Sequence, residues 1–243
     1  MTAPETNLAD IRQAWEARGN SSATSGLQQQ ALDNFLAAGF PTTRLEDWKY
    51  TDTRSVAKHY PQWLSTTAET QAESPECIIA ADAFRLVFID GRFAPEQSSA
   101  DLPTEVYGGD LAGLAEKYPE ACARTFGKLA TAPGYTSLNT AFAQDVAAIV
   151  LPDNTELDKL VYLNFYTATP EVIAQPRLLI DIGKHSRATV IEHYTSSAAA
   201  IVNTVSEARC DTGSDLTWYR LQAESNETSH LSAQYLSAEQ DAT

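Results

Sequence analysis

The side chains that could carry acid–base or metal chemistry are few, and the four histidines are the first to consider. They are His59, His185, His193 and His230, and Glu192 directly precedes His193 in a β-type pattern. Neighbouring side chains of a strand point to opposite faces. Glu192 and His193 therefore cannot form one acid–base pair or chelate one metal together. We expect these histidines to be structural or to face solvent, and we assign no catalytic or metal-binding residue.

The sequence has an odd number of cysteines, and no two of them form a C-x-x-C motif. They are Cys77, Cys122 and Cys210. A disulfide framework or a zinc site would need paired cysteines or close histidines. Because a free cysteine packs like a small hydrophobic residue, we expect all three to be semi-buried. A reactive thiol or a cluster ligand is the alternative, so their role stays unassigned.

The motifs of the common enzyme classes are absent. The sequence contains no phosphate-binding G-x-x-x-x-G-K-[ST], no G-x-G-x-x-G, no G-x-S-x-G and no H-E-x-x-H. Carboxylates could still serve a carbohydrate-active or carbohydrate-binding β-helix protein, either as acid–base groups or as calcium ligands. Such a site needs several acids on one face of adjacent strands, whereas here they fall mainly at turns: Asp153, Glu156, Asp158, Asp211, Asp215, Glu224 and Glu227.

The elements of the N-terminal part, residues 1–136, are helical or mixed. Apolar spacing predicts helices over Leu8–Gly19 and Leu27–Ala38, the second ending at Gly39. Asp110 is a plausible N-cap of a short helix, and Asp90-Gly91 predicts a hairpin within Arg85–Ala94.

Aromatic and charged residues crowd the stretch Thr42–Tyr60. We interpret this stretch as a docking corner that holds the helical arm against the next unit of the chain. Trp48 and Tyr50 would be its anchors, and the charged residues would form a solvated rim.

From residue 137 to 243 we expect only β structure, because the apolar runs are short, β-branched or aromatic, and bounded by turn residues. The spacing allows either an antiparallel sandwich or barrel, or a solenoid of stacked parallel strands. Hairpin dipeptides are missing from these turns and the strands start 11 to 17 residues apart, which favours the solenoid. The candidate strands are 148–151, 161–166, 178–182, 189–194, 201–206, 217–222 and 231–236.

The charge and the apolar content of the chain limit which classes of molecule could be its partners. The chain has 243 residues and a formal net charge of −15. This charge disfavours nucleic acid and anionic membranes as partners. No apolar run approaches the roughly 20 residues that cross a bilayer, and the polar N-terminus is unlike a secretion signal. We therefore expect a cytoplasmic protein.

Four segments, in order along the chain, carry a resemblance to a known family. RLEDWKYT at 44–51 resembles the R-x-E-x-W-K-Y-T segment of the SufB/SufD family of iron–sulfur cluster assembly proteins. The strand-like segments RLVFIDGRF at 85–93 and ATVIEHYTS at 188–196 match as well, as does SLNTAF at 137–142. The octet is specific, whereas the strand segments alone are weak.

The resemblance implies a mainly β fold, a right-handed parallel β-helix preceded by an N-terminal helical and mixed α+β domain. It also implies a non-catalytic scaffold resembling SufD, which acts with a SufB-like paralogue and a SufC-like ATPase in cluster assembly and iron acquisition. The assembled complex would handle the cluster or the iron, and no cofactor is assigned to a residue of this chain.

The family's chains extend well beyond the length matched here, so we expect this sequence to be an N-terminal portion of a longer reading frame. Its β-helix would then be incomplete at the C-terminal end. An incomplete coil exposes unpaired strands, and we therefore expect the chain to self-associate, with a homodimer as one form.

Overall fold

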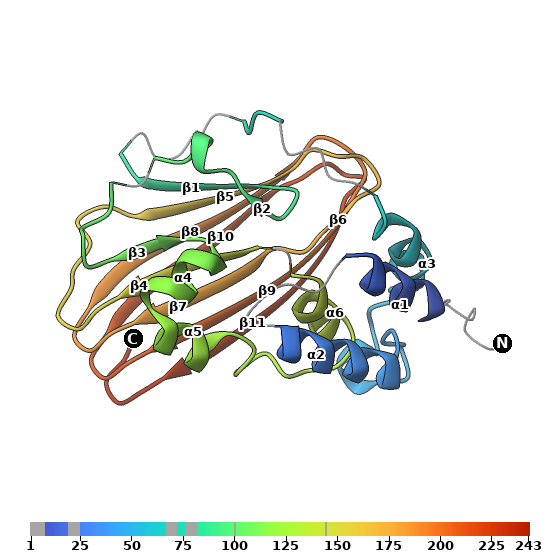
Figure 1. Ribbon diagram of the computed structural model, residues 1–243, viewed down its shortest axis with the longest axis horizontal. Coiled ribbons are helices and arrows are strands. Elements are labelled where there is room, and N and C mark those ends of the chain that lie inside the picture. The colour runs from blue at the N-terminus through green and yellow to red at the C-terminus, as the bar shows by residue number, and fades with distance from the viewer. Residues whose placement is uncertain (1–7, 19–24, 67–71, 76–81, 100, 144) are drawn as a thin grey trace.

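A computed structural model describes residues 8–18, 25–66, 72–75, 82–99, 101–143 and 145–243, and its centre is a solenoid of two facing β-sheets (Figure 1). The first sheet has the order β10-β8-β5-β1-β2 and the second β11-β9-β7-β4-β3, with the short β6 also paired to β9. The strands are β1 Phe84–Ile89, β2 Arg92–Phe93, β3 Tyr107–Gly109, β4 Val146–Leu151, β5 Val161–Thr167, β6 Ile173–Ala174, β7 Arg177–Ile182, β8 Arg187–Ser196, β9 Ile201–Cys210, β10 Asp215–Ala223 and β11 Ser229–Ala238.

Successive coils stack in parallel at a nearly constant offset. Asp215 lies opposite Arg187 in the first sheet, Val205 opposite Arg177 and Ser229 opposite Ile201 in the second. Each of these pairs is 28 residues apart, so one coil contributes one long strand to each sheet. The parallel solenoid predicted from strand spacing is confirmed, and the sandwich alternative is wrong. Each of the seven candidate strands coincides with part of an observed strand.

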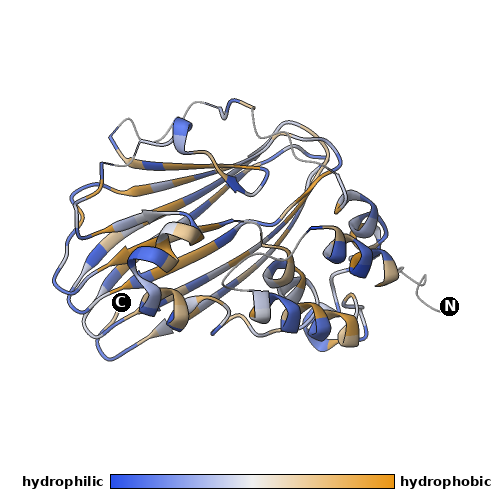
Figure 2. Cartoon of the chain, viewed as in Figure 1, coloured by the Kyte–Doolittle hydropathy of each residue, from blue (hydrophilic) through white to orange (hydrophobic). Residues whose placement is uncertain are grey.

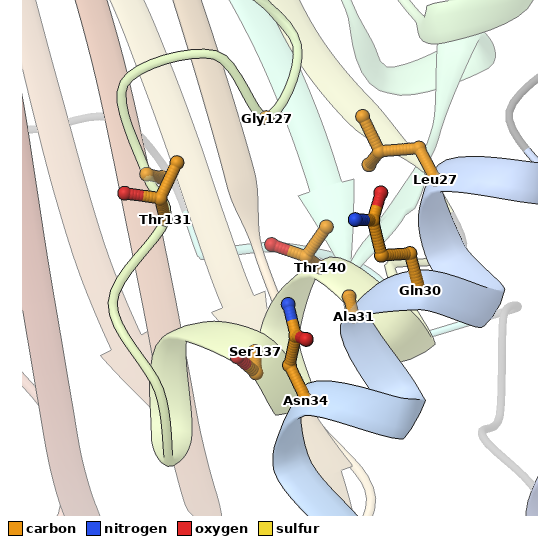
Figure 3. A pocket seen from close by; sticks show the side chains of 9 residues that line it. Leu27, Gln30, Ala31, Asn34, Gly127, Thr131, Ser137 and Thr140 are labelled. Atoms are coloured by element: carbon orange, nitrogen blue, oxygen red, sulfur yellow. The ribbon is translucent and has the colours of Figure 1, made fainter.

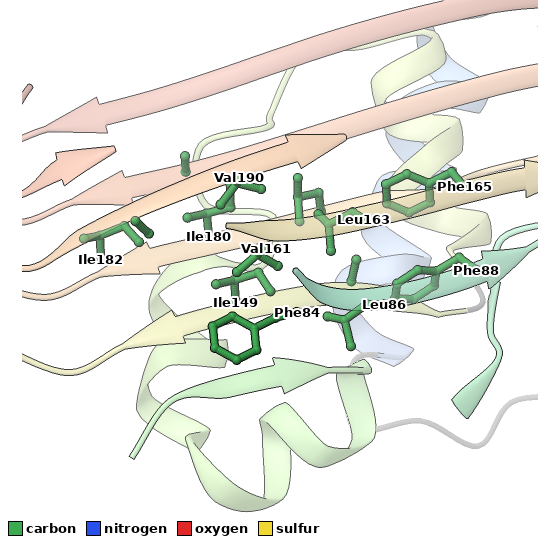
Figure 4. Packing of buried hydrophobic residues seen from close by; sticks show 14 of the residues in the cluster. Phe84, Leu86, Phe88, Ile149, Val161, Leu163, Phe165, Ile180, Ile182 and Val190 are labelled. Carbon is green, nitrogen blue, oxygen red and sulfur yellow. The ribbon is translucent and has the colours of Figure 1, made fainter. Parts of the chain in front are cut away.

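The space between the two sheets, here called the lumen, is filled by every second side chain of each strand. Hydrophilic and hydrophobic residues alternate along the strands (Figure 2), as expected for a pleated backbone with one buried face. Aromatic and branched side chains of neighbouring coils pack on one another (Figure 4). Phe88, Phe165 and Tyr194 form one such column, with ring centroids 5.2 and 4.9 Å apart.

Two short antiparallel strands flank the first coil. β2 returns along β1, and β3 pairs antiparallel with β4. The β1–β2 turn contains Asp90 at φ 49° and Gly91 at φ 82°, which is the backbone of the hairpin turn that the Asp-Gly dipeptide predicts. The outer edges of β1 and β4 are therefore covered at this end of the solenoid.

Helices cover the outer face of the second sheet (Figure 1). Helix α4 packs on β4, α5 on β7 and α6 on β9, while α2 lies along α6 and α1 against α3. The Asp110 side chain caps α4 by accepting from the Gly113 backbone N–H at 2.8 Å, as predicted. The helices are α1 Leu8–Ala17, α2 Ser25–Ala38, α3 Arg54–Trp63, α4 Leu111–Lys117, α5 Pro119–Thr125 and α6 Tyr135–Phe142, with short 3-10 turns at Glu46–Trp48 and Pro95–Gln97.

Three sequence expectations need comment. Residues 137–142 are helical, in α6, and not β, because this short apolar segment is enclosed by α2 and β9 and buries every residue. Trp48 packs against the helical core, but Tyr50 is 90% exposed and anchors nothing. The boundary at 136/137 stays a prediction, and the parallel pairing of β1 with β5 joins residues from both of its sides.

Candidate functional site

The lumen changes from apolar to polar along the solenoid. In one column of the first sheet, Leu86 lies beside Leu163, Leu163 beside Glu192, and Glu192 beside Arg220. A charged pair thus continues a column that begins with two leucines. Burial of a charge is costly unless the charge is paired and hydrogen-bonded. The interior of the last two coils therefore contains specific polar contacts as well as apolar packing.

Glu192 is the centre of this polar lumen, which we define as Glu192, Tyr194, Ser206, Trp218, Arg220, Glu224 and His230. Its carboxylate is fully buried and accepts from Arg220 Nη2 at 3.0 Å and from Trp218 Nε1 at 2.6 Å. The Tyr194 hydroxyl donates to it as well. These hydrogen bonds from a cation and from neutral donors compensate the burial of the carboxylate inside the solenoid.

Arg220 links the two sheets. Its Nη2 donates to Ser206 Oγ at 3.1 Å, and its Nη1 donates to Ser232 on the facing strand β11. The guanidinium also lies 5.5 Å from the Tyr194 ring. Burial, followed by the negative charge of Glu192, raises the pKa of Tyr194 well above 10, so this hydroxyl is a hydrogen-bond donor at neutral pH and not a base.

A second pair lies beside Tyr194. His230 Nδ1 is 2.9 Å from Glu224 Oε2, and both side chains are 8% exposed. The His230 ring stands edge-on to Tyr194 at 4.9 Å. Two buried atoms here, Arg220 Nε and His230 Nε2, have no hydrogen-bond partner among the described residues. The polar lumen therefore contains unsatisfied polar atoms beside its two pairs.

The other chemistry-bearing residues are scattered. His193 lies on the outer face of the first sheet, bonded to the Tyr162 hydroxyl, opposite in direction to Glu192. His185 occupies a turn at φ 54° and His59 packs against Trp63. Within the described ranges, no three His, Cys, Asp or Glu side chains are arranged to hold a metal ion.

Of the cysteines, Cys210 is buried in the lumen and Cys122 is half-buried on α5. Burial raises the pKa of both thiols, which makes them poor nucleophiles at neutral pH. Cys77 lies outside the described residues.

Buried charges also lie on the outer face of the second sheet, under the helices. Arg177 and Glu207 form an ion pair in which both side chains are fully buried. Glu207 additionally accepts the backbone N–H groups of Gly127, Leu129 and Ala130 at 2.7 to 2.9 Å. Asp181, beside them, binds Arg124 and Arg209. Because arginines and backbone groups occupy these carboxylates, they form no acidic groove for a sugar or for calcium.

One cavity of about 130 Å³ lies between α2, α6 and the loop after α5 (Figure 3). The amides of Gln30 and Asn34 and the hydroxyl of Thr140 line it, together with Leu27 and Ala31. Amides and hydroxyls line it, but none of the described residues that line it is charged.

Sequence reasoning missed the two buried ion pairs. The signal for Glu192 and Arg220 was present, because both share the lumen-facing parity of apolar or aromatic residues on their strands, such as Val190 and Trp218. Nothing in the sequence indicated the pairing of Arg177 with Glu207, since helices from elsewhere in the chain decide their burial.

Comparison with known proteins covers almost the whole chain. The SufBD protein N-terminal region matches residues 9–163, and the SufBD core domain of the SUF iron–sulfur cluster assembly system matches residues 165–243. A SufBD family protein of Synechocystis sp. is 29% identical over 220 residues, which are 84% of this chain and 48% of that protein. SufD of Escherichia coli is 29% identical over 201 residues, 78% of this chain and 44% of that protein.

A more distant relative is the chloroplastic protein ABCI7 of Arabidopsis thaliana, 20% identical over 217 residues. The chain spans about half the length of the curated relatives it matches. No helix of the described part combines the length and the apolarity that a bilayer crossing needs. The two SufBD regions match one after the other along the chain. The chain therefore belongs to the SufBD family of the iron–sulfur cluster assembly system.

Proposed function

We propose that this chain acts as a scaffold subunit of the Suf machinery, together with a SufB-like paralogue and a SufC-like ATPase, in iron–sulfur cluster assembly and iron acquisition. The observation that carries the proposal is the match of the SufBD regions to residues 9–163 and 165–243. The curated relatives are described as iron–sulfur cluster assembly proteins.

The chemistry of the described residues supports a scaffold and not an enzyme. The carboxylates that lie on strands are neutralised by arginines, both described thiols have raised pKa values, and the cavity beside α2 is uncharged. A scaffold needs stiff sheets and exposed edges more than it needs a reactive pocket. In this proposal the cluster or the iron is cargo of the assembled complex, and the chain works in the cytoplasm.

The direct test is co-expression of the chain with the SufB-like and SufC-like proteins of the same organism, followed by affinity purification and native mass spectrometry. We expect a complex that contains the chain in a fixed stoichiometry. Iron and sulfide should be recovered with that complex and not with the chain alone.

The carbohydrate alternative is tested in the same preparation. Saturable binding of calcium or of an oligosaccharide, combined with no affinity for either Suf protein, would overturn the scaffold proposal. We expect no heat of binding when calcium or a panel of oligosaccharides is titrated into the purified chain.

A further inference from the structure

We draw no further inference here: the strongest candidate, the open last coil of the solenoid, where Arg220 Nε and His230 Nε2 lie buried without a hydrogen-bond partner among the described residues beside the free edges of β10 and β11, carries none because nothing in the structure shows what covers it.

Discussion

At the scale of single residues, the buried charges are the costliest features of the chain. Arg177 and Glu207 lie on neighbouring strands beneath the α5–α6 connection. Arg177 also donates to Thr140 Oγ1 at 2.9 Å and to Asn139 Oδ1 at 3.1 Å, both on α6. The pair therefore joins the second sheet to the helices that cover it. A buried ion pair of this kind specifies how the two layers pack and contributes little net stability.

Replacement of Glu207 by Gln removes the charge that compensates a fully buried guanidinium. We expect the free energy of unfolding, measured with urea, to fall by about 3 kcal/mol or more. Arg187→Ala is the control, because Arg187 is 62% exposed in its pairs with Glu156 and Asp215, and exposed pairs contribute at most about 1 kcal/mol. Equal losses in the two variants would contradict a structural role for the buried pair.

His193 provides a pH dependence. Burial lowers its pKa from the ordinary value of 6.5, so the unfolded chain binds a proton at His193 more readily than the folded one. Its contribution to stability is present above pH 6.5 and is lost as the pH falls towards the folded pKa. We expect His193→Gln, which can still bond to the Tyr162 hydroxyl, to lose less stability on acidification from about pH 7 to 5 than the unmodified chain.

Nuclear magnetic resonance titration of the imidazole protons measures the same shift directly. The His193 pKa should lie below 6.5, and a value above 6.5 would show that its environment favours the charged ring.

At the scale of elements, the turns that join the second sheet to the first form a ladder. Asn154, His185, Gly213 and Asp241 occupy equivalent places in successive coils and have φ values of 58°, 54°, 67° and 57°. Each of the first three donates its backbone N–H to a carbonyl of the next turn: Lys184, Thr212 and Gln240, at 2.7 to 3.1 Å. Because each turn has a residue in the left-handed conformation at the equivalent place, the turns stack directly on one another. This stacking fixes the register of both sheets.

Gly183, in the same ladder, is required for another reason. A Cβ atom there would lie 2.6 Å from backbone atoms of Pro152 and Asp153 in the preceding turn, and a backbone in a stacked coil cannot move aside. We expect Gly183→Ala to lower the free energy of unfolding by about 1–3 kcal/mol, the cost of overpacking.

The control for Gly183→Ala is Gly26→Ala. Nothing lies within 4 Å of a Cβ atom at Gly26, which is in α2, so this change should raise stability by up to about 1 kcal/mol. A neutral Gly183→Ala would mean that neighbouring coils are more loosely stacked than the structure indicates.

At the scale of the whole molecule, the two ends of the solenoid differ. β2 and β3 cover one end, whereas β10 and β11 at the other pair only with β8 and β9 among the described strands. Lumen-facing side chains of β11 from Ser232 to Ala238 are exposed, Leu236 by 62%. An unpaired edge with an apolar face is a template for association.

We expect the average mass of the purified chain, measured by light scattering after gel filtration, to rise with concentration. Leu236→Lys should reduce this self-association, because a charge at an edge disfavours strand pairing. Leu45→Lys, at a similarly exposed position between α2 and α3 and away from both edge strands, should leave it unchanged. A chain that stays monomeric at high concentration would contradict the prediction.

Much of the architecture could be predicted. The strands are runs of β-branched and aromatic residues, and turn residues separate each run from the next. The helix at residues 135–142 could not, since SLNTAF has no strong helical pattern and becomes a helix by packing between α2 and β9. Tyr50 was misjudged for the opposite reason. Its aromatic character predicts burial, but the turn that contains it points it outward.

The amino-acid sequence by itself determined the positions of the strands, the absence of paired cysteines and the strongly acidic surface, because these depend on residue type and local spacing. Only the tertiary structure decided that Glu192 meets Arg220 and that Arg177 meets Glu207. Those contacts arise between coils about 28 to 30 residues apart, where the stacking register, and not any local pattern, selects which side chains share the interior. Burial by coils and helices distant in sequence then determines which of these charges must be paired.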